Sequence, residues 1–219
     1  MALIRLAPSH ILLSTAVYAQ ESSSHLTMTF SPNNLSTCAD RHSSQGITFT
    51  TSSIPLVPEC FNLDEIFTSN TSSGLILQPI AGGNDPYQLT WKVHNRQIYD
   101  PNANYSRIRY QQTNGTGEIP EGAAAGRRFN AYPGRDCAQG EDEVTGERQW
   151  GYEMSCQSSQ EGSCHETGLG IRSFLVAGAT DANEGGECLD WVQQGAGARR
   201  FEVSMVVWMA AGLLVIVPL

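Results

Sequence analysis

Six cysteines limit what this chain can fold into more than any other feature, because disulfides form and persist in oxidising compartments. They are Cys38, Cys60, Cys137, Cys156, Cys164 and Cys188. An even set of this kind predicts three disulfides. The long gap between Cys60 and Cys137 favours a local bond between Cys38 and Cys60, which leaves the last four cysteines to pair among themselves. No C-x-x-C pair is present, so zinc binding is the weaker interpretation.

The N-terminus has the pattern of a secretory signal peptide. Arg5 supplies a positive charge, residues 11–17 form a short apolar stretch, and Ala19 offers a small residue at which a signal peptidase cuts. We therefore expect residues 1–19 to be removed. The apolar stretch is much shorter than the roughly 20 residues that a membrane-spanning helix needs.

The C-terminal region has the pattern that directs attachment of a glycosylphosphatidylinositol (GPI) anchor. Small residues begin at Gly195 and Ala196, a short polar segment follows, and residues 205–219 form an unbroken apolar run. We expect residues 193–204 to be the linker and spacer around the anchor site, and Gly195 or Ala196 to carry the glycolipid after the apolar tail is removed. The alternative is a short spanning helix, but the run falls below the roughly 20 residues that a bilayer core requires.

Four Asn-x-Ser/Thr sequences indicate N-glycosylation, and all four lie between the two predicted cleavage sites. The acceptor residues are Asn34, Asn70, Asn104 and Asn114. None has proline at the middle position, so each is a valid acceptor in a secreted protein and is expected at the surface.

The central part of the chain has the pattern of a single β-rich domain at residues 38–192, preceded by an exposed Ser/Thr-rich leader at residues 20–37. Residues 46–51 and 87–93 alternate apolar and polar side chains, as half-buried strands do. Other expected strands are at residues 75–80, 98–99, 107–111, 149–156 and 170–177. Residues 60–67 are expected to form a short helix, capped by Asn62, with Leu63, Ile66 and Phe67 turned inward.

These elements predict a mainly β fold, a disulfide-stapled antiparallel sandwich or barrel with at most one short helix and long loops. Residues 113–147 are mostly glycine, alanine and charged residues. We expect them to form a long surface loop or a partly disordered stretch, since structureless segments of this length are uncommon inside compact domains.

Charge and motifs exclude some functions and weaken others. The formal net charge of -9 argues against nucleic acid as a partner, because phosphate binding needs clustered Lys and Arg. Neither G-x-S-x-G nor H-E-x-x-H occurs, and we predict no catalytic residue, cofactor or metal site. His94 could act as a general base near Glu65 or Asp100, but a polar-face residue of a strand is the simpler interpretation.

The order of signal peptide, cysteine-containing β domain, glycan acceptors and glycolipid signal resembles the GPI-anchored cell-surface and cell-wall proteins of filamentous fungi. The resemblance implies an extracellular lipoprotein on the outer leaflet of the plasma membrane, which can be transferred to cell-wall glucan. It is carried by the two termini and extends to the rest of the chain only as a layout.

Together these features predict a non-catalytic surface or cell-wall glycoprotein with a structural, adhesive or host-facing role. One alternative is a carbohydrate-active protein, either a glycan-binding module or a wall-remodelling hydrolase, because aromatic residues such as Trp150 and Trp191 can stack on sugar rings. A second alternative is a metal-capturing surface protein that uses His and acidic clusters.

Overall fold

The computed structural model describes residues 24–40, 42–83, 85–113, 120–141, 146, 148–180, 182–183 and 187–194. The predicted signal peptide, the anchor-site residues Gly195 and Ala196, the apolar tail and Asn114 lie outside the described residues. Within them, no helix is long and apolar enough to cross a bilayer.

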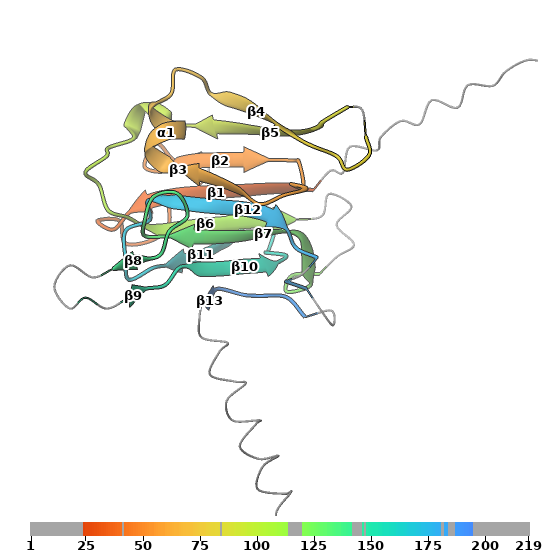
Figure 1. Cartoon of the computed structure of the whole chain (residues 1–219). Coiled ribbons are helices and arrows are strands. Elements are labelled where there is room, and N and C mark those ends of the chain that lie inside the picture. The colour runs from red at the N-terminus through yellow and green to blue at the C-terminus, as the bar shows by residue number, and fades with distance from the viewer. Residues whose placement is uncertain are drawn as a thin grey trace, which may run out of the picture.

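Two antiparallel sheets pack face to face as a sandwich (Figure 1). Sheet A has the order β11 (Ser163–Glu166), β6 (Tyr105–Thr113), β1 (His25–Pro32), β2 (Ile47–Thr51), β5 (Tyr87–His94) and β4 (Ser73–Gln78). Sheet B has the order β13 (Val192–Gln193), β10 (Tyr152–Cys156), β7 (Ala124–Tyr132), β12 (Ser173–Gly178) and β3 (Glu59–Asn62). Each sheet keeps two edge strands, so the described strands form a sandwich and close no barrel.

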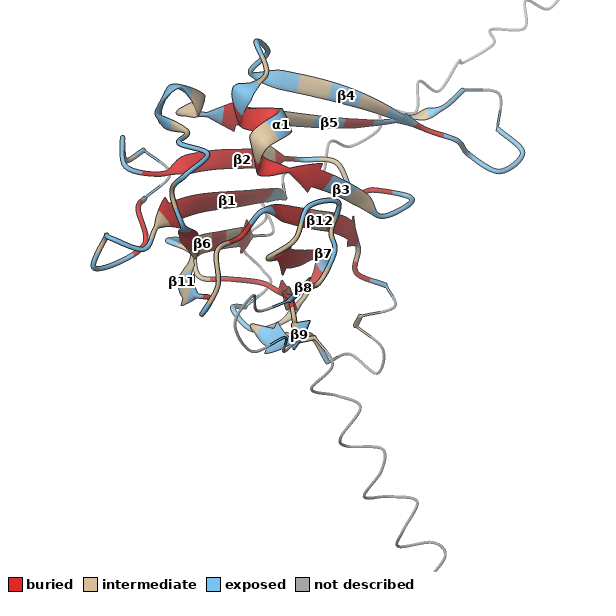
Figure 2. Ribbon diagram, turned by 60° about the vertical axis from the view of Figure 1, so that its left-hand side comes forward, coloured by how far each residue is buried: buried red, intermediate tan, exposed pale blue. Residues whose placement is uncertain are grey.

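The core lies between the sheets and is rich in aromatic rings. Phe30 and Phe49 of sheet A meet Phe174 of sheet B, with ring centroids 5.2 and 4.9 Å from that of Phe174. Phe129 and Tyr110 extend the cluster along the two sheets. Figure 2 shows the buried residues concentrated on the central strands of both sheets. Burial of this apolar surface is the main favourable term in folding.

Strand β1 overturns the prediction of an exposed leader at residues 20–37. It is a central strand of sheet A, paired with β2 on one side and with β6 on the other. Leu26, Met28 and Phe30 are fully buried, and threonine or serine occupies the alternate positions. The abundance of small hydroxyl residues hid a regular period-two pattern, so the domain begins well before Cys38.

Strand β7 likewise overturns the prediction of a long loop at residues 113–147. It pairs with β10 and β12 in the middle of sheet B, and Phe129 on it is fully buried. The inward-facing series of β7 includes Arg127, which is 1% exposed. A charged residue in a core position broke the apolar pattern that would have marked the strand. The short strands β8 (Gly140–Glu141) and β9 (Arg148–Gln149) also lie in this region and form a small hairpin.

The other expected elements are found with shifted ends. Strands β2, β4, β5, β6, β10 and β12 cover the predicted strands, but residues 98–99 do not form one, because η1 (Arg96–Ile98) is a turn of 3-10 helix. Helix α1 (Leu63–Thr68) begins after Asn62 and buries Leu63, Ile66 and Phe67 as expected. The Asn62 side chain is not a cap, since its Oδ1 accepts instead from the backbone N–H of Asp136 at 2.8 Å.

All six cysteines pair, and this confirms the prediction of three disulfides. The bonds join Cys38 to Cys164, Cys60 to Cys137, and Cys156 to Cys188. The expected local bond between Cys38 and Cys60 is wrong, because the chain crosses from one sheet to the other between them. Cys38 follows β1 of sheet A, whereas Cys60 lies on β3 of sheet B.

Candidate functional site

A polar groove lies on the outer face of sheet A, away from the core. It is lined by Thr27, Thr29, Asp40, His42, Arg109, Gln111, Gln160 and Glu161 and has a volume of about 500 Å³. We call this depression the sheet A groove. Its volume falls within the range of about 300–1,000 Å³ that small-molecule sites in proteins span.

Alternation along two neighbouring strands builds the floor of the groove. Thr27 and Thr29 alternate with the core residues of β1, and Arg109 and Gln111 alternate with Ile108 and Tyr110 of β6. The strands are in a register that sets Thr27 opposite Gln111. Thr29 lies opposite Arg109 in the same ladder. Side chains at these positions point to one face of the sheet, so the floor is polar throughout.

Arg109 holds the two walls of the groove together. Its Nε donates to Ala39 O at 3.3 Å and its Nη2 donates to Cys38 O at 3.4 Å, which fixes the first wall. Its Nη1 donates to Glu161 O at 3.2 Å, which fixes the second wall. The guanidinium also pairs with Asp40 Oδ1 at 3.1 Å. Since these bonds use the fork of donors on one guanidinium, the walls are held without any ligand.

Two further contacts fix the walls in place. The disulfide between Cys38 and Cys164 ties the first wall to β11, the strand that pairs with β6 beside Arg109. Gln111 Nε2 donates to the backbone oxygen of Gln160 in the second wall. The groove is therefore built from four separate segments of the chain, which are joined by a disulfide, an ion pair and side-chain hydrogen bonds.

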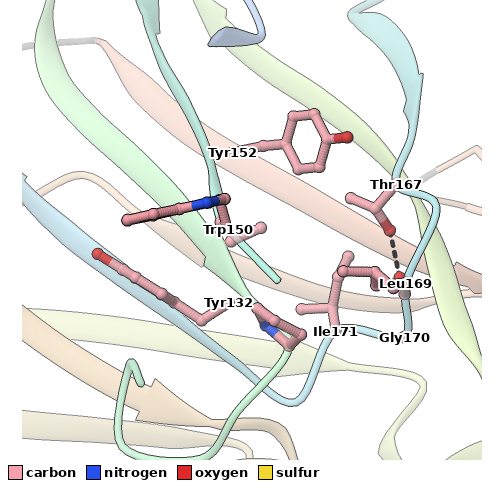
Figure 3. A pocket seen from close by; sticks show the side chains of 10 residues that line it. Tyr132, Trp150, Tyr152, Thr167, Leu169, Gly170 and Ile171 are labelled. Carbon is pink, nitrogen blue, oxygen red and sulfur yellow. Dashed lines mark hydrogen bonds between the residues drawn. The ribbon is translucent and has the colours of Figure 1, made fainter. Parts of the chain in front are cut away.

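An aromatic pocket lies beside sheet B, near β13, and is shown in Figure 3. Tyr132, Trp150 and Tyr152 approach each other there, with Leu169 and Ile171 opposite. Its volume is only about 10 Å³, which is room for a single water molecule. We therefore interpret it as packed structure and not as a ligand site. Trp150, one of the residues that the sequence suggested for stacking on sugar rings, thus packs against other residues of the protein here.

The rings of Trp191 and His165 continue this packing. The Trp191 ring stacks on Tyr152 with centroids 4.8 Å apart and on His165 with centroids 4.6 Å apart. Burial lowers the pKa of His165, and the carboxylate of Asp190 acts in the opposite direction. Its Nε2 is buried without a hydrogen-bond partner among the described residues. This arrangement favours a neutral, structural imidazole, because burial disfavours the charged form.

A second tyrosine pair lies against helix α1. Tyr99 stacks on Tyr105 with centroids 5.6 Å apart and on Phe67 at 6.0 Å. Burial, with a smaller contribution from Asp64, raises the pKa of Tyr99 to about 12. Burial also raises the pKa of Tyr105, whose hydroxyl accepts from the backbone N–H of Asp100. Raised values of this kind keep both phenols neutral, so these rings are part of the packing.

Within the described part of the chain, no hydrogen bond or ion pair joins His94 to Glu65 or Asp100, the partners that the sequence suggested for catalysis. His94 is exposed on the outer face of β5, opposite Thr48. Glu65 lies on α1 and pairs with Arg135 at 2.8 Å. Among the described residues, no group of three or more His, Cys, Asp or Glu side chains is placed to hold a metal ion.

Three of the four glycan acceptors are described, and all three are exposed. Asn34 lies in the turn after β1, Asn70 follows α1, and Asn104 directly precedes β6. Glycosylation needs such exposure, since the glycan is bulky and polar.

Sequence reasoning missed the sheet A groove, because no local pattern links its four segments. The available signal was a set of outward-facing polar residues, Thr27 and Thr29 of β1 and Arg109 and Gln111 of β6. They form a polar stripe once the two strands are known to be neighbours. That neighbour relation depends on recognising β1 as a strand.

The fold and the groove define a class of protein, namely a disulfide-bonded antiparallel β-sandwich with a polar depression on one outer face. In comparisons with known proteins, no family model, curated protein or solved structure matches the chain.

Proposed function

We propose that this protein is an extracellular glycoprotein that a C-terminal glycolipid holds on the outer leaflet of the plasma membrane. Its sandwich has a non-catalytic structural, adhesive or host-facing role there. The observation that carries the proposal is the set of three disulfides, which pairs every cysteine of the chain. Disulfides of this number fit the oxidising conditions of the secretory pathway.

The bounds of the described strands support the same proposal. The first strand, β1, begins at His25, a few residues after the expected cleavage at Ala19. The last strand, β13, ends at Gln193, two residues before the first candidate anchor residue, Gly195. Both cuts would leave every described strand intact. The exposed acceptors Asn34, Asn70 and Asn104 add support, because glycans are attached in the same compartment.

In this proposal the anchor is retained at the membrane or transferred to cell-wall glucan. Transfer follows from the resemblance to fungal cell-wall proteins and would make glucan a covalent partner. A membrane-retained protein and a wall-linked protein differ in extraction, because detergent releases only the former and a glucan-degrading enzyme releases the latter.

Treatment of intact cells with phosphatidylinositol-specific phospholipase C tests the proposal. We expect the enzyme to release the protein into the medium and the heat-inactivated enzyme to leave it on the cells. A protein that resists both this phospholipase and glucan digestion, yet dissolves in detergent, would contradict glycolipid anchoring and favour a membrane-spanning tail.

The second candidate function is a carbohydrate-active protein, and the sheet A groove favours it. Thr, Gln, Asp and Glu side chains that line the groove are the hydrogen-bonding groups that recognise sugar hydroxyls. Of its two forms, a glycan-binding module fits better than a hydrolase. The groove carboxylate of Asp40 is already engaged by Arg109, whereas glycoside hydrolysis uses a pair of carboxyl groups that act on one bond.

A further inference from the structure

We propose that the sheet A groove binds a short stretch of a neutral, hydroxyl-rich oligosaccharide through Gln160, Glu161 and the polar floor beneath them. This inference rests on the second candidate function and adds the site and the chemical class of its ligand.

The shape of the groove supports a specific site. Its walls are held by Arg109, Gln111 and the disulfide between Cys38 and Cys164. A site that is formed before binding loses little conformational entropy when a ligand enters. Pre-formed walls therefore favour the groove over a loop surface that would have to become ordered.

The charge of the groove disfavours polyanions. Asp40 and Glu161 bring two carboxylates, and Arg109 brings one guanidinium that Asp40 and three backbone oxygens already engage. The chain as a whole has a formal net charge of -9. His42 also lines the groove, so among its described residues two carboxylates stand against one guanidinium that is already engaged and one imidazole. An acidic oligosaccharide would meet these like charges, and this costs affinity.

The groove also contains polar groups that the protein itself leaves unsatisfied. The side chains of Gln160 and Glu161 are exposed and make no hydrogen bond or ion pair with any described residue. The Thr27 hydroxyl lies in the floor and also makes no such bond within the described part of the chain. The backbones of Gln160 and Glu161, in contrast, are fixed by Gln111 and Arg109. Unpaired groups on a fixed backbone are suited to bind an external partner.

Hydroxyl groups match this set of partners. A carboxylate and an amide oxygen accept hydrogen bonds from sugar hydroxyls, and an amide NH₂ donates to them. Sites built to pair with ligand hydroxyls discriminate against analogues that lack them. The aromatic pocket near β13 offers no such set and has space for only a single water.

The test measures binding of the full chain, purified in detergent, to defined hexasaccharides by titration calorimetry. The probes are hexamers of β-1,3-linked glucose, α-1,6-linked mannose, N-acetylglucosamine and galacturonic acid. We expect at least one neutral hexamer to bind and the acidic galacturonate hexamer to bind at least tenfold more weakly.

Two variants locate the site. The double variant Gln160→Ala/Glu161→Ala removes the two unpaired side chains and should weaken binding of the neutral hexamer about tenfold, since each lost hydrogen bond typically accounts for a factor of about two to ten. The matched control is Asp85→Asn, which changes an exposed carboxylate between β4 and β5. These strands lie at the edge of sheet A opposite to β6 and β11. The control should leave binding unchanged.

Each outcome decides a separate question. Equal binding by the wild type and the double variant would overturn the groove as the site, although the protein would still be a glycan binder. Stronger binding of the galacturonate hexamer would overturn the ligand class, and absence of binding to all four hexamers would overturn both. None of these results depends on phospholipase release, so the anchor is tested separately.

Discussion

Cys38 and Cys164 are 126 residues apart in the sequence, yet a disulfide brings their Cα atoms to 5.7 Å. The bond ties a wall of the sheet A groove to the edge strand β11. In the chain-entropy account, a disulfide stabilises a protein mainly by restricting the unfolded chain, and longer loops gain more. The same bond therefore contributes to stability and to the shape of the groove.

We predict that the Cys38→Ser/Cys164→Ser variant loses about 4–5 kcal/mol of unfolding free energy. The Cys156→Ser/Cys188→Ser variant, which opens a bond with a separation of 32 residues, should lose about 1 kcal/mol less. Urea denaturation of both variants measures the difference.

Peptide mapping of the unreduced protein should recover the three disulfide pairs described above, and a peptide linking Cys38 to Cys60 would refute the fold.

Arg127 is a buried cation bound by neutral oxygens. Its Nε donates to Ser53 O at 2.8 Å, its Nη2 donates to Ser24 O at 3.1 Å, and Ser52 O is a further acceptor. Burial lowers its pKa, but an arginine remains protonated in proteins. These contacts join the start of β1 to β7 and to the segment after β2, so the side chain connects the two sheets.

We predict that Arg127→Ala destabilises the protein by about 3 kcal/mol, because it leaves a cavity and removes the partners of buried polar groups. The neighbouring Arg128→Ala should cost less than about 1 kcal/mol, since the ion pair of Arg128 with Glu153 is partly exposed. Thermal or urea unfolding distinguishes the two. Equal losses of unfolding free energy in the two variants would contradict a larger contribution of the Arg127 contacts to stability.

His165 makes stability depend on pH. Burial lowers its pKa in the folded protein, so the unfolded chain, in which the pKa is about 6.5, takes up the proton first as the pH falls. The contribution of His165 is therefore complete above about pH 6.5 and is lost as the pH falls toward the lowered value. We expect the melting temperature to drop between pH 7 and pH 5.

The His165→Gln variant should show a smaller drop over that range than the wild type. Differential scanning calorimetry at a series of pH values measures each. Parallel curves for wild type and His165→Gln would mean that burial of His165 does not affect stability.

Exposure of Asn34, Asn70 and Asn104 predicts that all three can carry glycans. When the protein is expressed in a secretory host, replacing each asparagine by glutamine should lower the apparent mass on a denaturing gel by that of one N-glycan. Enzymatic removal of N-glycans should make all variants migrate together. A variant whose migration is the same as that of the wild type marks an acceptor that is not used.

Strands with clean alternation could be predicted from the sequence, and β2 and β5 are the clearest cases. Strand β1 was missed because its outward residues are threonine and serine, which resemble an exposed linker when composition is considered without periodicity. Strand β7 was missed because Arg127 stands in its inward series. Its charge is tolerated there only because backbone oxygens from distant segments converge on it.

The groove and the disulfide pairing depend on which strands become neighbours. Asp40 and Glu161 come together only once β1, β6 and β11 are adjacent, and Cys38 reaches Cys164 for the same reason. Sequence separation therefore misled the pairing prediction, since a sandwich brings residues that are far apart in sequence close together in space. The six cysteines themselves, in contrast, correctly predicted the number of disulfides.

Mass spectrometry of the C-terminal peptide of the mature protein tests the central claim most directly. After reduction and trypsin digestion, the peptide that begins at Ser173 should end at Gly195 or Ala196 and carry a glycolipid remnant. Recovery of that peptide extended without modification to Arg199, together with a peptide that ends at Leu219, would contradict the anchor and with it the proposed role at the cell surface.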